Sequence, residues 1–205
     1  VSNRATNKNY TGTGHRHGSQ GESFHLPRYL RLIDAALRPV VQGSDKPLIL
    51  ATTKQLENLF RSISVIPAVD EAITGNPERL SASELADAAR PVLDAYYAEL
   101  VQAFHVLYDE RSGQPRTTTD ISDAARLATF GGIDKLLIDM DSVVDGFIDE
   151  ETGEVSFGAE GDAQNYSIID EIAGRALRTG AKVMAVRKDD IPGHQQLAAI
   201  LRYPI

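Results

Sequence analysis

Amphipathic helices alternate with short apolar strands along this chain of 205 residues. In the first half, apolar side chains recur at helical spacing over 26–41 and over 54–62, which predicts two helices, and Pro27 suits the first turn of the first. Between them, the apolar run PLILA at 47–51 predicts a short buried strand. A helix, a strand and a helix joined by short connections are typical of layered domains, so the sequence predicts an α/β fold.

A capping box at Ser81 and Glu84 predicts the start of a long helix that contains Pro91 and ends at 112–113. After the turn signals at 112–118 the alternation resumes, and we place the boundary between two domains there, giving segments 1–114 and 115–205.

The second half of the chain again alternates helices and strands. Thr119 or Asp120 can cap a helix that Gly131 and Gly132 terminate, and a strand follows at 135–138. Further on, the pattern predicts an acidic β-hairpin over 145–157 with its turn at 151–153, a helix over 166–179 and a strand over 182–186. The segment 195–200 fits either a helix or a strand.

Positive charge is concentrated at the start of an acidic protein. Residues 1–32 contain five basic side chains and one acidic one, whereas the other 173 residues contain 16 basic and 28 acidic side chains. The glycine- and histidine-rich segment GHRHGSQG at 14–21 lies inside this basic region. A polyanion would therefore be attracted to the N-terminal loop rather than to the rest of the chain.

The composition also excludes several classes of site. Without cysteine, the chain has no disulfide, thiolate nucleophile or iron–sulfur cluster. No run approaches the roughly 18 apolar residues of a membrane helix and no signal peptide is evident, so we expect a cytoplasmic protein of a bacterium or archaeon. Because the first residue is Val1 rather than Met, we also expect the chain to be part of a longer protein.

Two groups of side chains suggest other chemistry. His15, His17 and His25 are candidate metal ligands, but the mobile His-x-His pair lacks a defined third ligand, so we expect neither a metal site nor a cofactor. Asp139 and Asp141 follow a strand, where α/β enzymes bind ligands, and they support the alternative of a metal-dependent hydrolase or nuclease of ribonuclease-H-like ancestry. A further alternative is a protein-interaction module that binds its partners through the acidic hairpin.

The order of several motifs carries a family resemblance: HRHGSQ ahead of a helix, PLILAT, ARLATFGGIDKLLID, IIDEIAGRALRTGAKVMAV and the terminal LAAILRY. Over roughly residues 12–205 the chain resembles the bacterial relatives of archaeal and eukaryotic class I peptide-chain release factors and Pelota. The resemblance implies a ribonuclease-H-like middle domain at 1–114, without its initial strands and with a flexible loop at 12–25. It also implies, at 115–205, an α/β/α sandwich similar to ribosomal proteins that bind RNA turns.

The resemblance also implies a function and a site. Release factors carry Gly-Gly-Gln in this loop, and Gly18-Ser19-Gln20 matches two of the three positions. A side chain at Ser19 restricts φ and ψ, so we expect ribosome binding in stalling, rescue or hibernation without peptidyl-tRNA hydrolysis, leaving Gln20 as a weak catalytic candidate. The implied partners are the ribosome, ribosomal RNA or tRNA, and a translational GTPase, with no membrane. The residues expected to contact RNA are Arg16, His17, Gly18, Ser19, Gln20 and Arg28.

Overall fold

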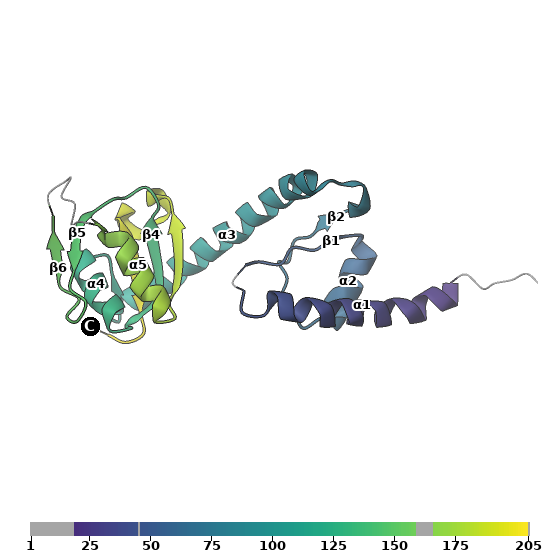
Figure 1. Cartoon of the computed structure of the whole chain (residues 1–205), viewed down its shortest axis with the longest axis horizontal. Coiled ribbons are helices and arrows are strands. Elements are labelled where there is room, and N and C mark those ends of the chain that lie inside the picture. The colour runs from purple at the N-terminus through teal and green to yellow at the C-terminus, as the bar shows by residue number, and fades with distance from the viewer. Residues whose placement is uncertain (1–18, 45, 159–165, 205) are drawn as a thin grey trace, which may run out of the picture. The chain divides into compact units, whose positions relative to one another are not determined.

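The computed structural model describes residues 19–44, 46–158 and 166–204 (Figure 1). The chain divides into two compact units, Val1–Tyr96 and Tyr97–Ile205. Both contain helices and strands, so the predicted α/β class is confirmed. The ribonuclease-H-like topology of the first domain stays a prediction.

The first unit consists of helices around a short parallel pair of strands, β1 and β2, in which Ala51 is the partner of Ile73. Its elements are α1 (Ser19–Val41), β1 (Ala51–Thr52), α2 (Lys54–Ile63), β2 (Ile73–Thr74), the 3-10 helix η1 (Pro77–Arg79) and the beginning of α3 (Ala82–Ser112).

Two elements of this unit differ from the sequence prediction. Helix α1 begins at Ser19 rather than at residue 26, and it continues through Pro27. A proline inside a helix removes one backbone donor, and here the helix tolerates that loss. The predicted strand at 47–51 is shorter in the structure, although the carbonyl oxygens of Leu48 and Leu50 still accept hydrogen bonds from the backbone of 69–73 at 2.8 Å each. Its side chains are half-buried rather than buried because the sheet has two strands among the described residues.

The second unit contains a four-stranded sheet in the order β3-β9-β4-β8. Strand β4 runs parallel to β8 and antiparallel to β9, which in turn is antiparallel to β3. The segment that fitted either a helix or a strand is therefore a strand, and it lies inside the sheet. The strands are β3 (Thr117–Thr118), β4 (Ile133–Asp139), β8 (Lys182–Val186) and β9 (Leu197–Leu201).

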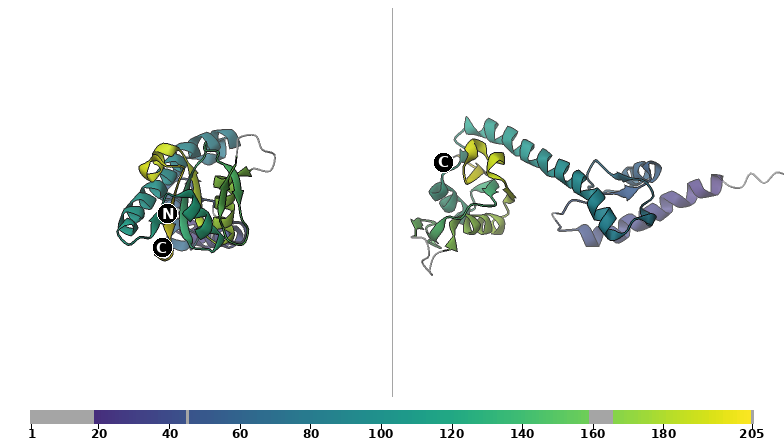
Figure 2. Two further views of the ribbon diagram at one scale, coloured as in Figure 1. Left: turned by 90° about the vertical axis from the view of Figure 1, so that its left-hand side faces the viewer. Right: turned by 90° about the horizontal axis from the view of Figure 1, so that it is seen from above.

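Helices cover both faces of this sheet (Figure 2). Because side chains alternate along a strand, Leu136 of β4 packs in one core with α4 (Ile121–Thr129) and α5 (Ile168–Arg178), whereas Leu137 packs in the other with Phe104 of α3. These three layers form an α/β/α sandwich. One layer is the end of α3, which lies before the predicted boundary at 114/115. The boundary was placed at a turn signal, and such a signal shows where a helix ends but not which core the helix contacts.

A second, smaller sheet in the order β6-β5-β7 completes this unit. It contains the predicted acidic hairpin, formed by β5 (Asp145–Ile148) and β6 (Val155–Phe157), and the short strand β7 (Tyr166–Ser167). Its turn depends on Gly153, which has a positive φ of +73°. The predicted hairpin is confirmed.

The predicted helix caps are also confirmed. The side chain of Glu84 accepts a hydrogen bond from the backbone N–H of Ser81 at 2.8 Å, and the Ser81 hydroxyl accepts one from the backbone of Glu84 at 3.3 Å. The carboxylate of Asp120 accepts a hydrogen bond from the backbone of Asp123 at 2.9 Å, at the start of α4. Local capping patterns therefore set where α3 and α4 begin.

Candidate nucleic-acid interface

The residues predicted to contact RNA lie at or near the start of α1. Arg16, His17 and Gly18 fall outside the described residues. Ser19 and Gln20 are the first two residues of α1, so their backbone is helical. Arg28 lies further along the same helix with an exposed side chain. The described part of the predicted site is thus carried by one helix.

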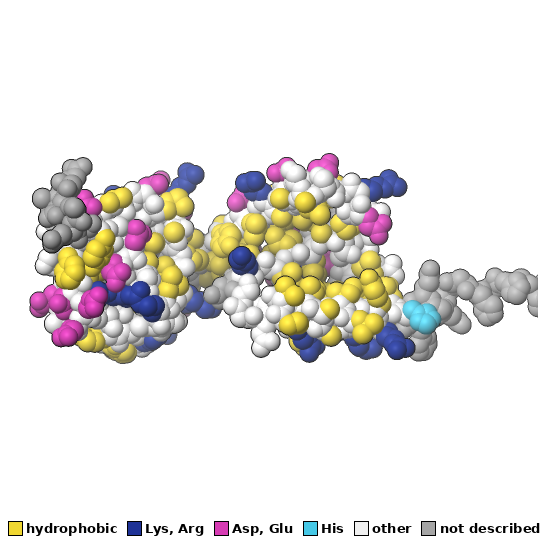
Figure 3. Space-filling view, viewed as in Figure 1, with side chains coloured by type: hydrophobic (Ala, Val, Ile, Leu, Met, Phe, Trp, Pro, Cys, Tyr) yellow, Lys and Arg dark blue, Asp and Glu magenta, His cyan; other side chains and the backbone are white. Residues whose placement is uncertain are grey.

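The exposed charges on the described side chains of α1 are basic. From His25 to Val41 the helix carries Arg28, Arg31 and Arg38 as well as a single acidic residue, Asp34. The side chain of Asp34 is 4% exposed and forms an ion pair with Arg38. Figure 3 shows Lys and Arg side chains along one edge of this helix and hydrophobic side chains on the face beside them. Such a surface attracts anions.

Helix α1 is held against α2 by apolar packing and by one buried carboxylate. Leu30 and Phe60 are buried. The hydroxyl of Ser64, which follows α2, donates a hydrogen bond of 2.6 Å to Asp34 Oδ1, and Arg38 Nε donates one of 2.9 Å to Asp34 Oδ2. These contacts, the Ser64 hydrogen bond foremost, lower the pKa of Asp34. Asp34 therefore stays ionised and anchors the helix that carries the basic surface.

A second buried carboxylate, Glu57 of α2, joins two basic side chains. Lys54 Nζ and Arg61 Nε each donate a hydrogen bond of 3.0 Å to it, and these contacts, that of Lys54 first, lower the pKa of Glu57. The guanidinium of Arg61 also donates to the carbonyl oxygens of Val69 and Asp70 at 2.7 and 2.9 Å. Glu57 thus fixes the segment before β2, which is a structural role.

The aspartates of the metal-dependent alternative do not form a metal site in the described structure. Asp139 is buried, and its Oδ1 accepts a hydrogen bond from the backbone N–H of Asp141 at 3.1 Å, which stabilises the turn after β4. Among residues 19–44, 46–158 and 166–204, no group of three or more histidine or acidic side chains is placed to hold a metal ion. Of the histidines singled out, His25 is exposed, and the other two, His15 and His17, lie outside the described residues.

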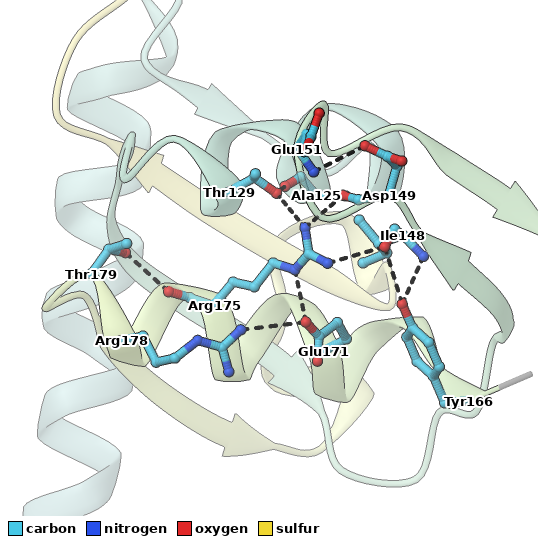
Figure 4. A network of polar contacts seen from close by, with 10 residues as sticks. All are labelled: Ala125, Thr129, Ile148, Asp149, Glu151, Tyr166, Glu171, Arg175, Arg178 and Thr179. Atoms are coloured by element: carbon cyan, nitrogen blue, oxygen red, sulfur yellow. Dashed lines mark hydrogen bonds and ion pairs between the residues drawn. The ribbon is translucent and has the colours of Figure 1, made fainter.

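Sequence reasoning missed a buried arginine that organises the second unit (Figure 4). Arg175 is 6% exposed. Its Nε donates to Glu171 at 2.7 Å, its Nη1 to the Thr129 hydroxyl at 2.7 Å and the Asp149 carbonyl at 2.9 Å, and its Nη2 to the Ile148 carbonyl at 3.0 Å. Arg175 thereby joins α4, α5 and the hairpin. The i,i+4 spacing of Glu171 and Arg175 is the signal that could have revealed the ion pair.

A polar cavity of about 350 Å³ adjoins this arginine. Arg175 already forms four hydrogen bonds within the unit, so its role in the wall of this cavity is structural. The lining residues are Ala128, Thr129, Glu150, Glu171, Arg175, Arg178 and Thr179.

The terminal LAAILRY motif also has a structural role. Arg202 donates hydrogen bonds of 2.9 Å to the carbonyl oxygens of Gly131 and Thr179, which lie just beyond the ends of α4 and α5. A cation at a helix C-terminus binds the free carbonyl groups and is favoured by the helix dipole. One side chain therefore caps two helices.

None of the helices among the described residues is both long enough and apolar enough to cross a membrane.

Comparisons with known proteins give a family match over part of the chain and a similar fold. Residues 1–99 match the model of bacterial archaeo-eukaryotic release factor family 11. No curated protein matches the sequence. Among solved structures, the chain is similar to ribosome-bound archaeal Pelota, described together with ABCE1, with a TM-score of 0.52 and 14% identity, covering 94% of this chain and 53% of Pelota.

The chain is also similar to Dom34 of S. cerevisiae, with a TM-score of 0.51 and 13% identity, covering 94% of this chain and 54% of Dom34. Dom34 is described as a translation termination-like factor that acts in RNA quality control pathways and interacts with Hbs1. The chain thus spans about half the length of the structures it matches. At these identities the structural likeness establishes the fold, and together with the family match it confirms the predicted resemblance to release factors and Pelota.

Proposed function

We propose that this chain acts as a ribosome-associated translation factor of the release-factor and Pelota type, in stalling, rescue or hibernation. The observation that carries this proposal is the match of residues 1–99 to the release factor family, because that region includes Gly18-Ser19-Gln20 and the whole of α1. The fold similarity to Pelota and Dom34 supports it from the rest of the chain.

Residues 16–20 and Arg28 form the proposed contact with ribosomal RNA or tRNA. Electrostatics supports this assignment, since residues 1–32 carry an excess of basic side chains on an otherwise acidic protein. Phosphate groups would be attracted to this end and repelled by the rest. Binding of this kind recognises the shape of folded RNA more than its sequence.

We also propose that the chain binds without hydrolysing peptidyl-tRNA. Ser19 replaces the middle glycine of Gly-Gly-Gln, and its Cβ restricts the backbone that would orient Gln20. The start of α1 at Ser19 supports this proposal, because a helical backbone at Ser19 and Gln20 is a regular turn that needs no glycine.

Proteins similar to this chain suggest its partners. Pelota is described as ribosome-bound together with ABCE1, and Dom34 as interacting with Hbs1. On this basis the proposed partners are the ribosome and a translational GTPase.

Sedimentation with purified bacterial ribosomes tests the proposed function. We expect the full chain to appear in the ribosomal pellet at 50 mM KCl and to be released progressively as the salt concentration rises, because phosphate contacts weaken with salt. Absence from the pellet at low salt, with ribosomes from both growing and starved cells, would contradict the proposal.

Release of peptide from programmed ribosomes tests the second proposal. We expect no hydrolysis above background for the native chain. A Ser19→Gly variant shows whether the residue at this position is responsible, with Ser19→Gly/Gln20→Ala as its control. Hydrolysis by the native chain that is lost on Gln20→Ala would refute the proposed lack of activity.

A further inference from the structure

Helix α1 carries a line of basic side chains that continues well beyond the predicted tip. Arg28, Arg31 and Arg38 follow one another at intervals of three and seven residues, which on a helix places them on one side. From the first to the last they extend over about 15 Å of the helix axis, at 1.5 Å per residue. We call these three residues the basic ridge.

The first two arginines of the ridge are available to a ligand. Arg28 and Arg31 are exposed, and no hydrogen bond or ion pair joins either of them to another described residue. Arg38 donates to Asp34, yet its side chain remains 53% exposed. Between His25 and Val41 no exposed carboxylate accompanies them, so their positive charge is not neutralised within that segment.

The side of α1 beside the ridge is occupied by the protein. Leu30 is 6% exposed and Asp34 is 3% exposed, both on the side that faces α2. Arg28 and Arg31 are nevertheless exposed, on a helix that Leu30 and Asp34 hold against α2. A row of guanidinium groups along one helix suits a ligand with regularly spaced negative charges.

We propose that the basic ridge, and Arg31 in particular, extends the RNA-binding surface along α1 by contacting successive phosphates. The inference rests on the proposed function and adds residues to its site. It explains why α1, on a protein of net charge −8, has its exposed described charges all of one sign. Arg28 links the two parts, because it belongs both to the predicted contact and to the ridge.

An anionic membrane is the other surface that such a helix could meet. Tyr29, Leu32 and Val40 are 59%, 64% and 74% exposed beside the ridge, and a basic helix with exposed apolar side chains can lie on a lipid surface. RNA is favoured because Leu30 is buried and Leu26, Ile33 and Leu37 are half-buried, so part of the apolar surface of α1 already packs against the unit. A helix that lies on a membrane needs that surface for the lipid.

The salt dependence of ribosome binding tests this inference. Each phosphate contact contributes about 0.7–0.9 to the slope of log K against log salt concentration. The full chain carrying Arg28→Gln/Arg31→Gln should therefore show a slope shallower by about 1.4–1.8, which corresponds to roughly 25- to 60-fold weaker binding at 0.1 M salt. An unchanged circular dichroism spectrum and melting temperature, expected for exposed residues, confirm that the variant is folded.

Arg79→Gln/Arg90→Gln is the matched control, because both arginines are exposed and the change in net charge is the same. Its slope should equal that of the native chain. Equal slopes for all three proteins, or an equal loss for both variants, would overturn the inference while the proposed function stood. If the native chain itself did not bind ribosomes, the proposed function would fail and this inference with it.

Vesicles of phosphatidylglycerol and phosphatidylcholine provide the second arm. Binding to these vesicles that disappears in Arg28→Gln/Arg31→Gln, with ribosome binding unchanged, would assign the ridge to a membrane and overturn the inference. Ribosome binding weakened as described, without vesicle binding, supports it.

Discussion

Replacing Arg175 with methionine should destabilise the second unit by about 3 kcal/mol. The substitution keeps an unbranched side chain of similar length but removes four hydrogen bonds, to Glu171, Thr129, Ile148 and Asp149. Breaking a buried ion pair by removing one partner costs about 3–5 kcal/mol.

The free-energy cost of Arg175→Met should lie at the lower end of this range, because the former partners of Arg175 keep other hydrogen bonds. The carbonyl oxygen of Asp149 still accepts a hydrogen bond from the backbone of Gly153 at 3.1 Å, and that of Ile148 one from the Tyr166 hydroxyl at 3.3 Å. Glu171 is 30% exposed and keeps Arg178 as a partner at 3.3 Å. No buried group is therefore left entirely without a partner.

Urea denaturation of the full chain, followed by circular dichroism, measures the loss of stability. Hydrogen exchange locates it, because the amides of 145–157 should lose protection first when the hairpin is released from α5. For a unit of this size the melting temperature should fall by roughly 10–20 °C. Arg178→Met is the control, since its side chain is 66% exposed and its removal should cost less than about 0.5 kcal/mol. A loss below about 1 kcal/mol for Arg175→Met, with unchanged protection of the hairpin, would refute the assigned role.

Three further predictions concern stability. The pKa values of Asp34 and Glu57 are lowered from 3.8 and 4.5, so the stability that these carboxylates contribute is present above those values and is lost as the pH falls through the folded-state pKa. The free energy of unfolding of Asp34→Asn/Glu57→Gln, measured across this acid range, should therefore depend less on pH than that of the native chain. Parallel curves for the two proteins would contradict this. Gly153→Ala should destabilise the hairpin by about 2 kcal/mol or more in urea denaturation, because φ is +73° and a Cβ would lie 2.8 Å from backbone of α4; a neutral effect would be inconsistent with this turn. Arg202→Gln should cost about 1–2 kcal/mol by the same measurement and increase hydrogen exchange at the ends of α4 and α5, whereas unchanged exchange there would show that the cap is dispensable.

Much of the fold follows from local sequence. The helix caps, the hairpin turn and the helix over 166–179 depend on residues a few positions apart, so their patterns can be recognised in the sequence. The start of α1 was predicted too late because Pro27 was taken as a first-turn residue, whereas the surrounding helix accommodates it. The strand at 47–51 is half-buried because its burial depends on neighbouring strands, which its own composition does not specify.

The candidate site was also predicted from the sequence only in part. Sequence order and charge identified the segment around Gly18-Ser19-Gln20 and Arg28. The availability of Arg31 and the anchoring of α1 through Asp34 required the structure, because Asp34 meets Ser64 across thirty positions of the chain.

The amino-acid sequence by itself determined the α/β class, most element boundaries, the basic start of an acidic chain and the resemblance to release factors and Pelota. Only the tertiary structure decided that the end of α3 forms a layer of the second unit, that Arg175 joins two helices to the hairpin, and that Arg202 caps α4 and α5 together. The physical reason is the range of the interactions: caps and turns form within a few residues, whereas packing and buried ion pairs join groups far apart in the chain.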